Sequence, residues 1–200
     1  MNLPGRPKAI RENLEAVAFL QDFTDMVRSV GGGALTIAEE STDFLGVTAL
    51  PPPRSERSHE RPYQPGLGFD LKWNMGWMHD TLAFLGEDPL FRRHHHATLP
   101  TIADYSRRER GLLPLSHDEV VHGKGSLLGK MSGDEWQRFA NLRALYAWMW
   151  AHPGAPLLFM GSELAPYGEW NADESLPWDL LQWEPHRGVF DLVRELNRLD

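Results

Sequence analysis

The sequence predicts an α/β protein with a parallel sheet, because short apolar segments alternate with longer amphipathic ones. Four apolar segments, 34–38, 68–73, 112–115 and 156–160, are predicted strands, and the first is apolar enough to be buried on both faces. Polar residues directly follow several of them, which is where a (β/α)8 barrel carries its chemistry. A closed barrel needs eight strands and about 250 residues. With four predicted strands, the sequence predicts half of such a barrel. The polar, proline-rich stretch 51–65 is predicted to be an exposed loop.

Three amphipathic helices are predicted from apolar residues at helical spacing. The first covers about residues 11–30 and stops at the three glycines 31–33, which favour a turn. The second begins at a capping-box pattern, residues 132–135, and its apolar stripe, which includes Trp136, is expected to be buried. The third covers residues 188–199. Weaker helical segments lie between the second and third predicted strands.

Composition and charge exclude several classes of protein. No run of about 18 apolar residues is present, and the N-terminal residues lack the apolar region of a secretory signal, so no membrane partner is expected. The absence of cysteine excludes disulfides and thiolate metal sites and is consistent with a cytoplasmic location. With 20 basic and 28 acidic residues the net charge is −8, and no basic block is present. A nucleic-acid partner is therefore not expected.

Carboxylates that follow predicted strands are candidate catalytic groups. Glu39 and Glu40 come directly after the first strand, and Asp118, with His117 beside it, follows the third. A pair of loop glutamates is ordinarily only solvated, but the end of a barrel strand is where catalytic acids are mounted. Glycosidic chemistry needs two carboxylates across a cleft, one as the acid and one to stabilise positive charge at the anomeric carbon.

The eight tryptophans are a further hint, because an indole face stacks well on a sugar ring. Trp73 and Trp77 flank Asn74 just after the second predicted strand, so these three residues are expected to line a cleft and contact substrate. Trp136 and Trp148 lie on a predicted helix and are expected to be core residues.

Two other motifs do not predict a metal or a cofactor. The segment 117–122 departs from H-E-x-x-H, because Asp follows the first histidine and the second comes one position late. It offers no third ligand, and the three histidines 94–96 are expected to be a solvated loop. The glycine-rich segment 123–130 departs from a phosphate-binding loop at two positions.

Longer runs of the sequence carry a family resemblance. They are TIAEEST at 36–42, GLGFDLKWNMGWMHD at 66–80 and LSHDEVVHGK at 115–124, continued in order at 157–161 and 169–171. These runs closely resemble the bacterial 1,4-α-glucan (glycogen) branching enzymes of the α-amylase superfamily. The resemblance covers nearly everything from Arg11 to Leu199.

The resemblance implies that residues 1–200 are the C-terminal half of a (β/α)8 TIM barrel, strands five to eight with flanking helices. It implies a retaining transfer in glycogen biosynthesis, in which an α-1,4-glucan is cleaved and the segment passes to a 6-hydroxyl to form an α-1,6 branch. Glu39 then corresponds to the acid/base, and Glu40 is a supporting residue. Asp118 corresponds to the carboxylate that steadies the oxocarbenium-like state, and His117 to a substrate-binding histidine.

The sequence also departs from the family. The family's nucleophilic aspartate, which lies upstream of the helix at 11–30, is not among these residues, nor are the first three strands, the N-terminal β-sandwich or the C-terminal β-domain. The run at 161–166 also differs. We therefore expect the 200 residues to be inactive on their own, with an α-glucan substrate and a complementary N-terminal half as partners. A non-catalytic glucan-binding remnant is the alternative. A hydrolytic amylase or debranching relative is less favoured, because runs 38–41 and 72–80 look like the branching subgroup.

Overall fold

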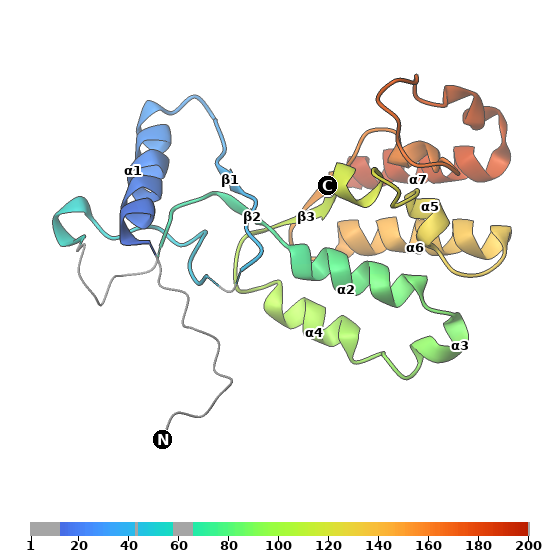
Figure 1. The fold of residues 1–200 in the computed structure, drawn as a ribbon, viewed down its shortest axis with the longest axis horizontal. Helices are drawn as coiled ribbons and strands as arrows, with labels where there is room; N and C mark the ends of the chain where they lie inside the picture. The colour runs from blue at the N-terminus through green and yellow to red at the C-terminus, as the bar shows by residue number, and fades with distance from the viewer. Residues whose placement is uncertain (1–12, 43, 58–65, 200) are drawn as a thin grey trace. The chain divides into compact units, whose positions relative to one another are not determined.

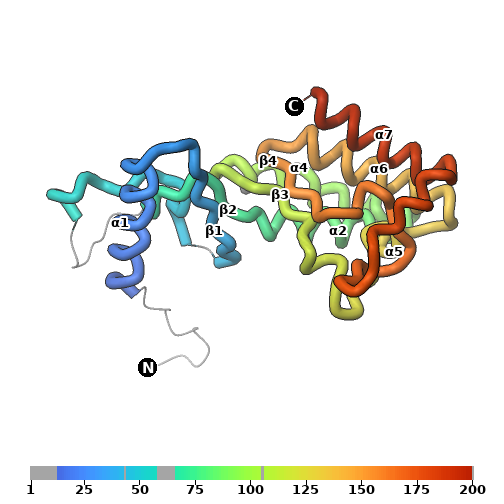
Figure 2. The backbone as a smooth tube through the Cα atoms, turned by 90° about the horizontal axis from the view of Figure 1, so that it is seen from above, coloured from blue at the N-terminus to red at the C-terminus, as the bar shows by residue number. Residues whose placement is uncertain are grey.

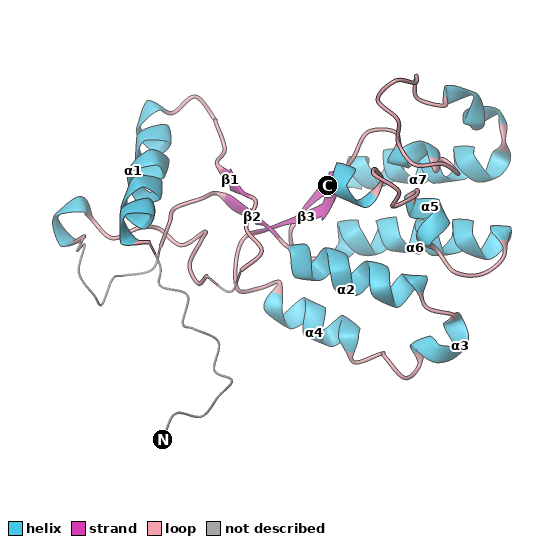
Figure 3. Cartoon of the chain, viewed as in Figure 1, coloured by secondary structure: helices cyan, strands magenta, loops and turns pink. Residues whose placement is uncertain are grey.

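The computed structural model describes residues 13–42, 44–57 and 66–199, and the chain divides into two compact units (Figure 1). The first comprises Met1–Ala38 and Thr42–Lys72, and the second comprises Glu39–Ser41 and Trp73–Asp200. One strand forms at each of the four predicted apolar segments, neighbouring strands pair in parallel, and helices lie beside them (Figure 3).

Helix α1, Leu14–Val30, is bounded by residues that suit the two ends of a helix. The side chain of Asn13 accepts hydrogen bonds from the backbone N–H groups of the second and third helical residues, both at 3.1 Å. The helix ends at Gly31, whose φ of +72° is a left-handed value that glycine adopts at little cost. The predicted helix and its stop are confirmed, and residues 11 and 12 lie outside the described residues.

Strand β1, Ile37–Ala38, pairs in parallel with β2, Leu71–Trp73, so that Ile37 lies opposite Leu71. Both strands are shorter than predicted, and just before β1 the backbone N–H of Thr36 donates to a side chain instead of to the neighbouring strand. The Asp70 carboxylate accepts from the backbone N–H and the hydroxyl of Thr36, at 2.7 and 2.8 Å. The prediction that the first strand is buried on both faces is wrong, since Ile37 is exposed and only its neighbour in the strand is buried.

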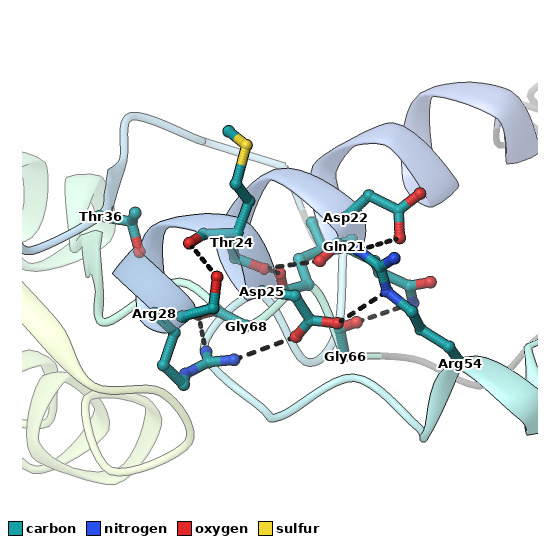
Figure 4. Close-up of polar contacts among 12 residues, drawn as sticks. Gln21, Asp22, Thr24, Asp25, Arg28, Thr36, Arg54, Gly66 and Gly68 are labelled. Carbon is teal, nitrogen blue, oxygen red and sulfur yellow. Dashed lines mark hydrogen bonds and ion pairs between the residues drawn. The ribbon is translucent and has the colours of Figure 1, made fainter. Parts of the chain in front are cut away.

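Side chains of α1 hold the segment that leads into β2 (Figure 4). Gln21 Nε2, Thr24 Oγ1 and Arg28 Nη2 donate to the three successive carbonyls of residues 66–68, at 2.8, 2.7 and 2.8 Å. The backbone acceptors of this segment are thereby satisfied by side chains, as buried carbonyls require.

Two arginines join the described part of the 51–65 stretch to α1. Arg57 donates through Nε to a backbone carbonyl at 2.9 Å, through Nη1 to Asp22 at 3.0 Å, and through Nη2 to Asp25. Arg54 contacts the same two aspartates (Figure 4), but its side chain is 67% exposed whereas that of Arg57 is 11% exposed. The prediction of an exposed loop is therefore wrong at Arg57.

The second unit is built on β3, Gly111–Leu115, and β4, Ala155–Leu158. They pair in parallel from Leu112 opposite Ala155 to Leu115 opposite Leu158. Helix α6, Glu135–Ala151, lies in the connection between them, as a parallel pair requires. All five residues of β3 are buried, so the third predicted strand is confirmed.

Helices pack against this strand pair and contribute most of the core of the second unit, and α6 and α7 run side by side (Figure 2). Besides α6 they are α2 (Met75–Gly86), α3 (Pro89–Arg92), α4 (Thr98–Tyr105), α5 (Leu127–Lys130) and α7 (Glu184–Leu199). Fully buried core side chains come from α2, β3, α6 and α7, among them Trp77, Leu113, Leu142, Tyr146 and Val189. Helix α7 begins at Glu184, four residues before the predicted start. Its second residue, Pro185, has no backbone N–H, but the first turn of a helix needs no intrahelical donor there.

The cap of α6 differs from the prediction. Asp134 Oδ1 accepts from the backbone N–H of Gln137 and Gln137 Oε1 accepts from that of Asp134, both at 2.8 Å. Ser132 Oγ instead donates to the carbonyl of Glu87, the residue that follows α2, at 2.8 Å. With this start the side chain of Trp136 faces solvent, so its prediction as core is wrong, whereas Trp148 packs against the core as predicted.

Replacing Arg57 by methionine should lower the free energy of unfolding by about 1–3 kcal/mol, because a largely shielded carboxylate and a carbonyl lose a charged donor. The same change at Arg54 should cost less than about 1 kcal/mol, since that guanidinium is well solvated. Urea unfolding followed by circular dichroism measures both. Equal losses of unfolding free energy in the two variants would contradict the stronger role of Arg57 in binding Asp22 and Asp25.

Candidate functional site

The turn that follows β3 presents His117 and Asp118. It is a 3-10 turn, His117–Glu119, and Ser116 caps it by accepting from the backbone N–H of Asp118 at 3.1 Å. The buried Glu119 carboxylate accepts from the backbone N–H and the hydroxyl of Ser116, at 2.6 and 2.9 Å. His117 Nε2 lies 3.5 Å from Asp118 Oδ1, and these side chains are 55% and 42% exposed. A fixed turn at the carboxyl end of a strand thus offers an acid and an imidazole to solvent.

The backbone on both sides of Glu39 and Glu40 is held by β2 and the residue before it. Asp70 anchors Thr36, which lies three residues before Glu39. Lys72 Nζ donates to the carbonyl three residues after Glu39, at 3.1 Å. The Glu39 side chain is exposed and that of Glu40 is half-buried. Glu39–Ser41 are grouped with the second unit, which also carries His117 and Asp118.

Asn74 and Trp77 both have structural roles. Full burial contradicts the expectation that Trp77 lines a cleft, whereas the substrate contact of the half-buried Asn74 stays a prediction. Asn74 Oδ1 accepts from the backbone N–H of Trp77 at 2.9 Å, which caps α2, and its Nδ2 donates to Ser106 Oγ at 2.9 Å. The Trp77 ring is fully buried in the core of the second unit. Trp73, at the end of β2, is half-buried. Asparagine just before an apolar helical run is a capping signal, and it indicates this role for Asn74.

Ser106 connects Asn74 to a buried histidine that the sequence analysis did not single out. His152 Nε2 lies 2.9 Å from Ser106 Oγ, and its ring centroid lies 4.8 Å from that of Trp148 and 6.2 Å from that of Trp77. Burial lowers the pKa of His152. Because Ser106 Oγ accepts from Asn74, its own proton is available to an unprotonated Nε2. This network belongs to the core.

The glycine-rich loop after Asp118 binds a carboxylate of the same chain. Glu169 Oε2 accepts from the backbone N–H groups of Gly123 and Gly125, at 2.8 and 3.2 Å. These glycines have φ values of +81° and +72°, left-handed values that glycine adopts at little cost, and both of their N–H groups reach the same carboxylate oxygen. Trp170 N donates to Val120 O at 2.9 Å. The two loops are therefore joined beside the turn that carries Asp118.

Neither a metal cluster nor a membrane span is found in the part of the chain that the structure describes. No three His, Asp or Glu side chains there are placed to hold a metal ion. No helix in that part is long and apolar enough to cross a bilayer. Residues 94–96 form an exposed turn, which confirms the predicted solvated loop.

Comparison with known proteins covers nearly the whole chain. Over 94% of its length it is 58% identical to the 1,4-alpha-glucan branching enzyme GlgB of Burkholderia pseudomallei (strain K96243). It is 57% identical over 94% of its length to GlgB 1 of Xanthomonas campestris pv. campestris (strain 8004). The resemblance to the branching enzymes is confirmed. The chain spans 24% and 25% of these two branching enzymes, and no protein-family model matches it.

Solved structures show the same fold. The debranching enzyme of Nostoc punctiforme, soaked with acarbose, matches 90% of this chain with a TM-score of 0.57 at 21% identity, over 36% of its own length. Cyclic alpha-maltosyl-(1→6)-maltose hydrolase from Arthrobacter globiformis, in complex with maltose, matches 97% with a TM-score of 0.56 at 18% identity, over 38% of its own length. The predicted α/β class and partial barrel are confirmed for these residues.

The buried His152 should make stability depend on pH. Its pKa is lowered in the folded chain, so the unfolded chain binds the proton more readily and the free energy of unfolding falls as pH drops below about 6.5. Above that pH both states are neutral and the effect disappears. Unfolding curves between pH 5 and 7.5 should show that His152→Gln has a flatter pH dependence. The exposed His79, changed to glutamine, is the control, and an equal flattening there would contradict the assignment.

Proposed function

We propose that this chain contributes the acid/base and the charge-stabilising carboxylate to 1,4-α-glucan branching. In that reaction an α-1,4 linkage is cleaved and the released segment is transferred to a 6-hydroxyl, which creates an α-1,6 branch. The observation that carries the proposal is 58% identity over 94% of the chain to enzymes named for this activity. Because the chain spans 24% of such a relative, the reaction is proposed for these residues together with the remainder of the enzyme. The α-glucan substrate, the single partial barrel domain and the cytoplasmic location are parts of the same proposal.

Glu39 is proposed as the proton-transfer residue. It first donates a proton to the glycosidic oxygen as the bond from that oxygen to the anomeric carbon breaks and a nucleophilic carboxylate from the remainder of the enzyme bonds to that carbon. It then takes the proton of the incoming 6-hydroxyl as that oxygen displaces the enzyme carboxylate from the anomeric carbon. Its exposed side chain lies on a segment anchored before and after it, and such anchoring favours the precise placement that proton transfer needs.

Asp118 is proposed to hold sugar hydroxyls and to stabilise positive charge at the anomeric carbon. A carboxylate fixed before the reaction begins needs no reorganisation as this charge develops. The cap by Ser116 and Glu119 supplies that rigidity, and the adjacent His117 is proposed as a substrate contact. Trp73 is retained as a candidate substrate contact because it is half-buried at the end of β2.

Glu39→Gln should lower branching of amylose at least about a hundredfold, because glutamine keeps the size of the side chain but transfers no proton. The test uses the reading frame rebuilt to the length of the relatives, with iodine-complex absorbance and α-1,6 linkages by NMR as readouts. An activated glycosyl donor, which needs little protonation, should still form the glycosyl-enzyme. Asp118→Asn should slow both donor types.

Glu40→Gln is the matched control for Glu39→Gln, since the two glutamates are adjacent and differ in burial. Its effect should be milder than either of the other changes. Loss of turnover in Glu40→Gln with retention in Glu39→Gln would reverse the assignment.

The 200 residues on their own should not branch amylose, and activity should appear when the remainder of a branching enzyme is co-expressed with them. The reason is that the family resemblance places the nucleophile outside these residues, and loss of a covalent nucleophile removes the first chemical step. Branching by the isolated chain would contradict this. Inactivity after complementation, with glucan binding retained, would favour the non-catalytic glucan-binding remnant.

A further inference from the structure

The segment that follows the turn with Asp118, residues 120–126, lies outside the described helices and strands. It is held instead by the loop after β4. At its start the backbone N–H of Trp170 donates to Val120 O, at 2.9 Å. At its end Ser126 Oγ donates to the carbonyl of Tyr167, at 3.0 Å. One neighbouring loop therefore holds this segment at both ends.

Glu169 supplies the contact in the middle of the segment. Its Oε2 atom alone accepts from the backbone N–H groups of Gly123 and Gly125, at 2.8 and 3.2 Å. Hydrogen bonds with an ionised partner are shorter and stronger than those between neutral groups. The side chain is exposed, so a substitution there opens no cavity in the core. Because both bonds end on one oxygen, an amide oxygen in the same place can also accept both.

The backbone of the segment is unusual at His122, which directly precedes the first of these N–H groups. Its φ of +57° is a left-handed value, which is uncommon for a residue with a side chain. Such a conformation persists where the surrounding structure determines it, and residues of this kind cluster at functional sites. The bond from Gly123 to Glu169 fixes the peptide group that follows His122. Glu169 thus helps to hold a shape that local preference disfavours.

We propose that Glu169 is a positioning residue that acts through Asp118, an inference that rests on the branching reaction proposed above. The cap of the turn fixes it on the side of β3, and Glu169 fixes the chain from the fifth residue after Asp118 onward. A carboxylate that stabilises charge at the anomeric carbon acts best when it is held in place before that charge develops. A small displacement of such a group lowers the rate strongly. Glu169 needs no contact with the substrate for this role and transfers no proton.

The test compares changes at Glu169 in the reading frame rebuilt to the length of the relatives, with kcat and KM for the branching of amylose as readouts. Glu169→Ala should lower kcat at least about tenfold and change KM less than about threefold, because the charge that Asp118 stabilises develops only in the transition state. Glu169→Gln should keep kcat within about threefold, since its amide oxygen can accept both N–H groups. Equal losses in the two variants would overturn the positioning role.

The matched control is Glu184→Ala, which removes the carboxylate of an exposed glutamate at the first residue of α7. Its kcat should stay within about twofold of the original enzyme. A loss equal to that of Glu169→Ala would overturn the role of Glu169.

A double-variant cycle shows whether Glu169 acts through Asp118. In the Asp118→Asn background, Glu169→Ala should lower the residual kcat by less than about threefold, because the carboxylate that it positions is already gone. A merely structural role would lower the rate by the same factor in both backgrounds, and that result would overturn the proposal.

Amide hydrogen exchange in the 200-residue chain, followed by NMR, tests the hold on the loop without any turnover. Exchange at Gly123 and Gly125 should be at least about fivefold faster in Glu169→Ala than in the original chain or in Glu169→Gln. Unchanged exchange would overturn the proposal. Should Glu169→Ala fail to fold, Glu169→Asp replaces it in every measurement. Its carboxylate is one methylene further from the glycines, so the same losses are expected, and their absence would contradict the proposal.

The positioning role and the proposed reaction can fail separately. Full branching in Glu39→Gln, with the expected losses in Asp118→Asn and Glu169→Ala, would refute the acid/base and support the positioning role. Unchanged kcat in Glu169→Ala, with losses in Glu39→Gln and Asp118→Asn, would do the reverse. Full branching in Asp118→Asn would overturn both.

Discussion

The hydrogen bonds between Ser116 and the buried Glu119 carboxylate determine how the chain leaves β3, and the candidate site depends on that turn. Burying a carboxylate costs free energy unless hydrogen-bond donors satisfy it. The backbone N–H and the hydroxyl of Ser116 therefore have to keep their hydrogen bonds to the Glu119 carboxylate. With them in place, His117 and Asp118 project from the turn. The carbonyl of Val120, just beyond it, is then positioned to accept from Trp170.

Hydrogen bonds from side chains to backbone groups also hold the other segments near the site at the ends of helices and strands. Asp70 and Lys72 hold the backbone around Glu39, Asn74 caps α2, and Glu169 is bound by the glycine-rich loop. In each case a side chain satisfies backbone groups that neither a helix nor a sheet pairs. Loops fixed in this way place functional groups reproducibly without needing strands long enough to reach them.

Burial separates the tryptophans into different roles. Trp77 is fully buried in the core, Trp136 faces solvent, and Trp170 is held at the wall of a pocket. An indole is large and apolar but carries one polar group, so it suits any of these environments. Which one it occupies depends on the elements that pack around it.

The local patterns of the sequence determined the features that depend on near neighbours. The alternation of strands and helices, the stop at Gly31 and the strand β3 were all predicted, because periodicity and helix-stop signals act within a few residues. The motif runs also predicted the similarity to 1,4-alpha-glucan branching enzymes that the comparison found. The placement of Glu39 and Asp118 at strand ends was predicted as well, while their roles stay a proposal.

Only the tertiary structure decided the features that depend on distant partners. The cap of α6 moved to Asp134 because Ser132 bonds instead to the end of α2, and β1 shortened because Asp70 takes the donors of Thr36. Trp77 is buried in the core, and the glycine-rich loop binds the carboxylate of Glu169 through its backbone N–H groups. Each outcome is set by a contact between residues far apart in the chain, and local periodicity and capping patterns carry no information about such contacts.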